Sequence, residues 1–382
     1  MRGKFAVAGL GVSQQGVKLG ISDLELRRQA VELAIEDAGI ERTAIDGYIH
    51  AWDTREDLRY LGLSPSFASA LFAGGASASM SLLAAAGAIA TGQADAVACV
   101  FGLAPTSGYV PGREGAKTIG AFGYGYASKA GLIGAASAHA LHARWYMDEY
   151  GATSADLGAV AVALREHACR RPEALGYGKP FTLADHQTSK MIVDPLRSLD
   201  CCRDSDGAVA VIITGAERAR ELHPRPVYLL GAGYGHNIRN WHNGTVYAHH
   251  DDIAPAAAKA FAQAGLTIDD VDVASFYDPF TISVLMQLEA YGFCKPGQAG
   301  AFVRDGGIGL GGSIPTNTGG GQLSGFYAAG FTALVEAIRQ LRSEAEAGQV
   351  KDAEVALVSG HGLNAGVQNT WGHVTLLLGN QS

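Results

Sequence analysis

The apolar positions of the chain predict an alternation of short buried strands and helices. Residues 5–11 form a nearly continuous apolar run that ends in glycine, which is typical of a buried strand followed by a turn. Residues 24–38 repeat apolar side chains with a helical period, and Gly39 provides a stop signal. Residues 45–50 then predict a second short strand. This order of elements indicates an α/β fold.

The same order returns in the second half of the chain. Residues 227–233 predict a strand with a glycine turn, residues 253–264 a helix and residues 271–276 the next strand. An Ala-rich helix with its following strand, residues 79–100, likewise has a counterpart in residues 332–358. Repetition at this scale indicates that one supersecondary unit occurs twice.

The repeat divides the chain into two halves of related structure. We expect the first half to span residues 1–225 and the second to span residues 226–382. The first half contains an insertion at about 105–195, which is too long for an ordinary connection and includes predicted helices at 137–150 and 155–169. The insertion is therefore expected to form structure of its own.

Small residues crowd the stretch 72–79, just before the Ala-rich helix. Such a turn lets backbone pass close to backbone or to a ligand. Ser77 or Ser79 is a candidate cap for the helix, which is apolar on nearly every face and is therefore expected to be buried. The amides at its N-terminus would favour a phosphate or a developing oxyanion. The alternative is a tightly packed core helix with no ligand.

Composition and charge exclude several classes of protein. The net charge of −8 over 382 residues, with no local basic cluster, argues against a nucleic-acid partner. The five cysteines have neither CxxC nor metal-ligand spacing, so we expect no metal site and no disulfide framework. The chain runs directly into a predicted strand and has no apolar stretch of membrane length. We therefore expect no membrane span and a cytoplasmic location.

Two further stretches carry candidate chemistry. Residues 276–281 and residues 315–330 each place a tyrosine, Tyr277 or Tyr327, at a predicted turn. A phenol in a partly desolvated pocket can exchange a proton or donate a hydrogen bond to an oxyanion. The alternative is that both rings fill space in a non-catalytic protein.

Together with the Gly-rich turn and the duplication, these stretches resemble the motifs of the thiolase superfamily over essentially the whole chain. In that family a nucleophilic cysteine stands where this chain has Gly75, and two histidines stand at the positions of Tyr277 and Tyr327. The last catalytic loop of the family corresponds to the stretch around His361, which also has no cysteine. The resemblance implies an α/β thiolase fold, in which duplicated βαβαβαββ halves form a five-layered α-β-α-β-α arrangement.

The paired tyrosines resemble the thiolase-like aldolases of steroid side-chain degradation, close to the sterol-carrier-protein branch. This resemblance implies retro-aldol cleavage of a bulky β-hydroxyacyl-CoA without an acyl-enzyme. Coenzyme A would be part of the substrate, and no cofactor would be bound. It also implies a homodimer paired through an edge near residues 71–73, a small zinc-ribbon/OB-fold partner protein, and an insertion that covers the site and binds the coenzyme A part.

The resemblance assigns Tyr277 and Tyr327 as the catalytic residues, facing one another across a pocket. One phenol would take the proton of the β-hydroxyl, and hydrogen bonds would hold the enolate. The expected residues of the substrate and oxyanion turn are Gly75, Ser77, Ser79 and His361, the last on a flexible loop. Two alternatives stay open: an acyltransferase in which Ser77 or another group replaces the cysteine, and a non-catalytic acyl-CoA- or lipid-binding subunit.

Two more stretches receive simpler interpretations. Arg203 and Asp204 directly precede a Ser-Asp-Gly stretch that contains Asp206, and these three charged residues are expected to form a charged turn with a structural role. The loop at 106–133 is rich in aromatic residues and glycine, which suits a bulky apolar substrate.

Overall fold

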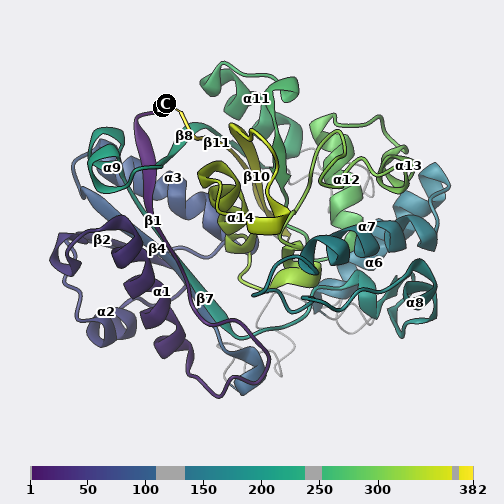
Figure 1. The fold of residues 1–382 in the computed structure, drawn as a ribbon, viewed down its shortest axis with the longest axis horizontal. Helices are drawn as coiled ribbons and strands as arrows, with labels where there is room; N and C mark the ends of the chain where they lie inside the picture. The colour runs from purple at the N-terminus through teal and green to yellow at the C-terminus, as the bar shows by residue number, and fades with distance from the viewer. Residues whose placement is uncertain (1, 109–133, 237–251, 364–369, 382) are drawn as a thin grey trace.

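The computed structural model describes residues 2–108, 134–236, 252–363 and 370–381. Within these residues nine strands form one mixed sheet in the order β3-β2-β4-β7-β1-β8-β11-β10-β9 (Figure 1). The strands of the first half are β1 (Phe5–Val12), β2 (Gly47–His50), β3 (Phe67–Ala70), β4 (Ala96–Leu103) and β7 (Gly207–Gly215). Those of the second half are β8 (Val227–Gly235), β9 (Val273–Ser275), β10 (Val355–Leu363) and β11 (Thr370–Gly379).

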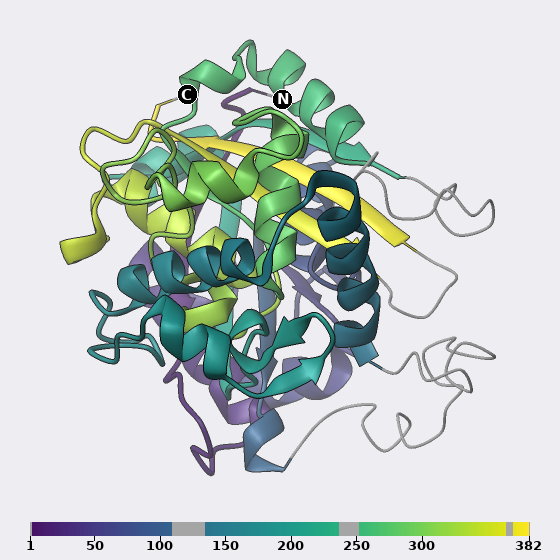
Figure 2. The ribbon, with the colours of Figure 1, turned by 90° about the vertical axis from the view of Figure 1, so that its right-hand side faces the viewer.

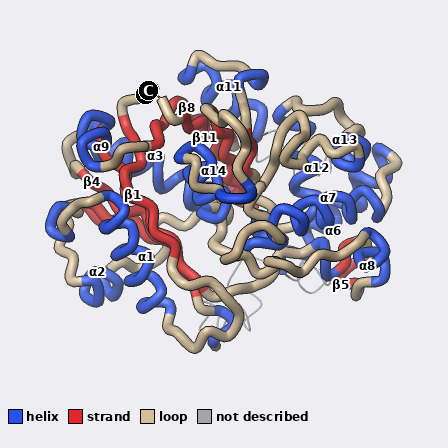
Figure 3. Tube along the Cα trace, viewed as in Figure 1, coloured by secondary structure: helices blue, strands red, loops and turns tan. Residues whose placement is uncertain are grey.

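The two halves of the sheet meet where β1 and β8 pair antiparallel, through Ala6 with Tyr228 and Val7 with Val227. Figure 3 shows the strands of both halves in red, on either side of this junction. Strand order is equivalent in the two halves, because β2-β4-β7-β1 corresponds to β9-β10-β11-β8. The expected duplication is therefore present in the topology.

Close approach of helix and strand also repeats. A Cβ atom on Gly9 of β1 would lie 2.2 Å from the carbonyl oxygen of Ala34, and one on Gly231 of β8 would lie 2.1 Å from that of Ala260. Only glycine permits this contact. The two helices that pack so closely are α1 (Asp23–Ala38) and α11 (Ile253–Ala264).

Two helices lie between the halves of the sheet, α3 (Ser77–Ala90) and α14 (Phe331–Arg342). Helix α3 contacts β4 and β7 of the first half and β10 and β11 of the second, and it also contacts α14. Helices α1 and α11 cover the opposite faces of the strands (Figure 1). This is the expected five-layered α-β-α-β-α arrangement.

Two local expectations for α3 are wrong. The residue before the helix is Ala76, which makes no capping bond, so neither Ser77 nor Ser79 caps it. The hydroxyl of Ser77 instead accepts the N–H of Ala73 at 2.9 Å and donates to the carbonyl of Gly74 at 2.7 Å, because the tight turn brings these groups closer than the helix amides. The helix is also not buried all round, since Gly87 is exposed.

The insertion of the first half lies against the second half. Its helix α7 packs against α12 and α13, and Figure 2 views the molecule from this side. The first insertion helix begins at Gly134, before the expected cap Ser137. The elements here are α6 (Gly134–Tyr150), α7 (Ser154–Ala168), α8 (Leu183–Thr188), β5 (Met191–Val193), β6 (Leu196–Arg197), α12 (Thr281–Tyr291) and α13 (Ala299–Arg304). The remaining helices are α2 (Arg55–Leu61) and α9 (Ala216–Leu222).

Most of the aromatic loop expected at 106–133 lies outside the described residues, which resume at 134. Among the helices that are described, none is long and apolar enough to cross a membrane.

Candidate active site

A cavity of about 1070 Å³ opens between the insertion and the two tyrosine-bearing turns of the second half. Tyr277 and Tyr327 both line it, so the fold brings together the two residues expected at the centre of the site. Other described residues of its wall are Arg165, Lys179, Phe181, Ile192, Leu199, Cys201, Cys202, Arg203, Asp204 and Phe280. The wall therefore combines aromatic and aliphatic surface with several charged groups.

Tyr277 is fixed through its backbone. Its N–H donates to the hydroxyl of Ser359 on β10 at 3.0 Å, and its carbonyl accepts the side-chain amide of Gln287 on α12 at 2.9 Å. The hydroxyl of Ser359 donates in turn to the amide oxygen of Gln287, which closes the network. Burial, with Tyr327 nearby, raises the pKa of Tyr277 well above its ordinary value. The phenol is therefore held in its protonated form.

The ring of Tyr277 covers Gly75. A Cβ atom built on Gly75 would lie 2.2–2.4 Å from three carbons of this ring, a distance that no real side chain tolerates. Tyr277 thus fills the space that a side chain at position 75 would need, and no nucleophile can project from that turn while the ring is in place.

Tyr327 sits on a second turn, directly before α14. Its N–H donates to the hydroxyl of Ser205 at 2.9 Å. The hydroxyl of Thr332 accepts the N–H of Ala328 at 3.0 Å and donates to the carbonyl of Phe326 at 3.1 Å, so both neighbours of Tyr327 are tied to the helix. Burial raises the pKa of Tyr327 above its ordinary value, and Cys202 and Asp204 add to the effect.

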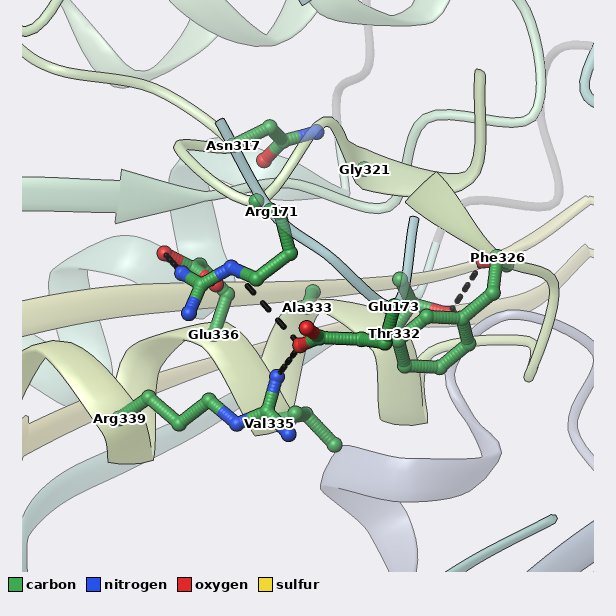
Figure 4. A pocket seen from close by; sticks show the side chains of 11 residues that line it. Arg171, Glu173, Asn317, Gly321, Phe326, Thr332, Ala333, Val335, Glu336 and Arg339 are labelled. Carbon is green, nitrogen blue, oxygen red and sulfur yellow. Dashed lines mark hydrogen bonds and ion pairs between the residues drawn. The ribbon is translucent and has the colours of Figure 1, made fainter. Parts of the chain in front are cut away.

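A buried ion pair and a half-buried one lie beside the residues that lead to this turn (Figure 4). Arg171 donates to the carboxylate of Glu336 on α14 at 2.8 Å, and Arg339 pairs with Glu173. The space among these side chains is about 20 Å³. A volume of this size corresponds to one or two water molecules, so this cluster is a support and not a substrate site.

Asp278 connects the two turns. Its buried carboxylate accepts the backbone N–H groups of Gln322 at 2.9 Å and Leu323 at 3.3 Å, in the turn that leads to Tyr327. Burial raises the pKa of Asp278 to about 7, although these hydrogen bonds act in the opposite direction. Asp278 therefore ties the Tyr277 turn to the segment that leads to Tyr327.

Two adjacent cysteines, Cys201 and Cys202, line the cavity although they stand at no position of the family's motifs. The N–H of Cys202 donates to the carbonyl of Pro279 at 2.8 Å, which places the pair beside the Tyr277 turn. Burial raises the pKa of Cys201 to about 12 and that of Cys202 further. Both groups are therefore thiols at neutral pH and not the thiolates that a nucleophile requires.

Comparison with known proteins shows the family of this chain. The family described as thiolase C-terminal domain-like matches residues 233–378. The chain is 38% identical over 360 residues to the 17-hydroxy-3-oxo-4-pregnene-20-carboxyl-CoA lyase of Mycobacterium tuberculosis, covering 90% of this chain and 92% of the relative. The chain belongs to the thiolase superfamily.

Further matches place it beside the aldolases of this superfamily. It is 37% identical over 355 residues to the steroid side-chain-cleaving aldolase of Thermomonospora curvata, covering 89% of this chain and 90% of the relative. The solved structure of the Ltp2-ChsH2(DUF35) aldolase superimposes with a TM-score of 0.88 at 36% identity, covering 99% of this chain and 98% of that one. Human mitochondrial 3-ketoacyl-CoA thiolase shares the fold, with a TM-score of 0.69 at 13% identity and 99% of each chain covered.

The other expected site residues stay near the Gly75 turn but do not line the cavity. Ser77 begins α3 just after that turn, and a Cβ atom on Gly360 would lie 3.0 Å from the hydroxyl of Ser79. Ser77, Ser79 and His361 are not among the described residues that line the large cavity. The expectation that His361 lies on a flexible loop is wrong, because β10 continues through it and pairs it with His373 on β11. There His361 is buried, with its ring nitrogen 3.5 Å from the carboxylate of Asp252.

The charged residues at 203–206 have two different roles. Asp206 has the structural role expected, since its carboxylate accepts the N–H groups of Leu19 at 3.1 Å and Thr106 at 2.7 Å. Arg203 and Asp204, by contrast, line the cavity. Among the residues that the structure describes, no group of His, Cys, Asp and Glu is arranged to hold a metal ion.

Proposed function

We propose that this protein is a thiolase-like aldolase that cleaves the Cα–Cβ bond of a bulky β-hydroxyacyl-CoA by a retro-aldol reaction. The observation that carries the proposal is the ring of Tyr277 over Gly75. It occupies the position from which an acyl-accepting side chain would project, and both Tyr277 and Tyr327 line the cavity. Retro-aldol cleavage requires no covalent intermediate.

Tyr277 and Tyr327 are proposed as the catalytic residues. Their raised pKa values favour neutral phenols, which donate hydrogen bonds and protons. When the bond breaks, negative charge develops on the thioester fragment as an enolate. Rigidly held donors that point at developing charge lower the barrier. We assign both phenols to this stabilisation, and one of them to the protonation of Cα.

The wall of the cavity supports a large apolar acyl group on coenzyme A. Phe181, Ile192 and Phe280 supply apolar surface, and Arg165 and Lys179 supply positive charge suited to phosphates. The printed name of the Mycobacterium tuberculosis relative specifies a steroid acyl-CoA. We therefore propose a steroid-type β-hydroxyacyl-CoA as the substrate.

We also propose a partner protein and a homodimer. The structure solved as the Ltp2-ChsH2(DUF35) aldolase names a DUF35 component beside Ltp2, and this chain covers 98% of the matched chain. A homodimer would pair through the edge of the sheet at β3, which the strand order leaves at one end. Light scattering during size-exclusion chromatography, with and without a DUF35 protein, measures both associations.

The direct test is incubation of the full chain, alone and with a DUF35 protein, with 17-hydroxy-3-oxo-4-pregnene-20-carboxyl-CoA. Mass spectrometry should detect a ketone and a shortened acyl-CoA in equal amounts. Intact mass measured during the reaction should show no acyl adduct.

A stable adduct would instead favour an acyltransferase that uses a group such as Cys202, which lines the cavity. Binding of the thioester without cleavage, even with the partner present, would favour a non-catalytic subunit.

A further inference from the structure

The proposed retro-aldol reaction needs a base, and this inference rests on that proposed function. Cleavage begins when the β-hydroxyl loses its proton, so some group must accept it. Burial raises the pKa of both Tyr277 and Tyr327, which keeps the two phenols as donors. The acceptor must therefore be sought among the other groups of the cavity.

The described wall of the cavity offers one carboxylate. Arg165, Lys179 and Arg203 are cations and do not accept a proton. Cys201 and Cys202 are thiols whose pKa values are raised by burial. Among the described lining residues, Asp204 alone supplies an acidic side chain, and carboxylates are the ordinary anionic bases of enzyme sites.

The backbone around Asp204 is anchored to both tyrosine turns. On one side, the N–H of Cys202 donates to the carbonyl of Pro279, two residues after Tyr277. On the other side, the hydroxyl of Ser205 accepts the N–H of Tyr327 at 2.9 Å. Asp206, one residue further, is fixed by its buried carboxylate. The segment 202–205 is thus a third wall that spans the two turns.

The carboxylate of Asp204 is not committed to another described group. The residue is exposed and lines the cavity, and no hydrogen bond or ion pair joins its side chain to the described residues. This differs from Asp278 and Asp206, whose carboxylates are both used by backbone N–H groups. A carboxylate that makes no other hydrogen bond, on a backbone held in place, suits a base that must contact the substrate.

We propose that Asp204 is the base that accepts the proton of the β-hydroxyl. The O–H electron pair becomes the new C=O bond while the Cα–Cβ bond breaks, and its electron pair passes to the enolate of the thioester. Tyr327 gives its phenolic proton to Cα. The carboxylic acid of Asp204 then returns its proton to the Tyr327 phenolate, so the site ends in its starting state and protons balance.

The test compares Asp204→Asn, Asp204→Ala and Asp148→Asn in the full chain, with 17-hydroxy-3-oxo-4-pregnene-20-carboxyl-CoA as the probe. Asp148 is an exposed carboxylate on α6 that does not line the cavity, so its variant is the matched control. We expect Asp204→Asn to lower kcat by on the order of a hundredfold with little change in KM. Added formate should restore activity to Asp204→Ala, since it supplies the missing carboxylate, but not to Tyr327→Phe.

The outcomes separate this inference from the proposed function. If the parent protein cleaves the probe and Asp204→Asn does so at the parental rate, Asp204 is not the base. The same conclusion follows if the variant changes KM alone or if formate rescues nothing. A parent protein that cleaves no β-hydroxyacyl-CoA overturns the proposed function, and this inference with it.

Discussion

Two turns of this molecule share a backbone and differ in what surrounds them. One precedes α3 and the other precedes α14, and each is closed by a bridge between an alanine and a glycine two residues later. In the first, the hydroxyl of Ser77 accepts the N–H of Ala73 at 2.9 Å. In the second, the hydroxyl of Thr332 accepts the N–H of Ala328 at 3.0 Å. The local structure is therefore the same.

The two turns differ in the groups that pack against their glycines. Above Gly75 lies the ring of Tyr277, whereas a Cβ atom on Gly330 would lie 2.1 Å from the carbonyl oxygen of Gly75 itself. Phe72, the residue before the first turn, is 39% exposed, but Tyr327, in the equivalent place before the second, lines the cavity. The comparison teaches that the same turn occurs twice, and that the two copies differ in the group that lies over the glycine: the Tyr277 ring over Gly75 and the backbone carbonyl of Gly75 over Gly330.

Removing the phenolic hydroxyls is expected to have the largest effect. Tyr277→Phe and Tyr327→Phe keep the ring that packs over Gly75 or against the cavity wall and remove only the proton donor. Each should lower turnover of the β-hydroxyacyl-CoA by on the order of a hundredfold or more. Thermal unfolding and association state should match the parent. Two variants that cleave as fast as the parent would disprove the role of the tyrosines.

Adding one methyl group to Gly75 should break the first turn. In Gly75→Ala the new Cβ atom must displace the Tyr277 ring, so we expect a loss of about 1–3 kcal/mol in the free energy of unfolding together with a loss of turnover. The double variant with Tyr277→Ala should recover part of that stability, which a double-mutant cycle measures.

The matched control is Gly87→Ala in α3, the helix that follows this turn, where a Cβ atom meets nothing within 4 Å. It should stabilise the helix by about 0.5–1 kcal/mol. Equal destabilisation by the two substitutions would contradict the packing of Tyr277 over Gly75.

Asp278, which links the turns, predicts a pH dependence of stability. Its pKa is raised to about 7 in the folded state. Between the lower pKa of the unfolded state and about pH 7, the folded state therefore binds more protons than the unfolded state. Stability should therefore fall as pH rises through this window, by about 1 kcal/mol per pH unit from this group. Urea unfolding of the parent and of Asp278→Asn at several pH values isolates the contribution, because the variant cannot titrate. Identical pH profiles would show that Asp278 is not perturbed.

The smallest effect on stability is expected from the hydroxyls of Ser77 and Thr332, which make the same hydrogen bond in the two turns. Ser77→Ala and Thr332→Val each leave one buried N–H without its acceptor, and each should lower the free energy of unfolding by about 1 kcal/mol. Thr332→Ser keeps the hydroxyl and should stay near the parent. Chemical denaturation that gives very different losses for the two positions would show that the turns are not equivalent.

Much of the fold could be predicted from the sequence, because it depends on local patterns. The apolar run of β1, the helical period of α1 and their later repetition specify elements and halves without knowledge of any contact. The tyrosines could be found because the motifs around Tyr277 and Tyr327 survive while the catalytic residues themselves have changed.

The parts that could not be predicted depend on contacts between distant segments. Nothing in the stretch 72–79 indicates that the ring of Tyr277 lies over Gly75. The pairing of Cys202 with Pro279 brings a third segment to the cavity, and it has no local signal. His361 was expected in a loop because glycines flank it, but the backbone pairs with β11 through this position.

The contact between Gly75 and Tyr277 also constrains how such a site can change over evolutionary time. A single substitution that places cysteine at position 75 would meet the tyrosine ring. A single substitution of Tyr277 removes a proposed proton donor and leaves the glycine bare. Acyl transfer from this turn would therefore need both changes, and the ring must be removed before a side chain at position 75 has room. The contact between Gly75 and the Tyr277 ring therefore makes the order of substitutions matter.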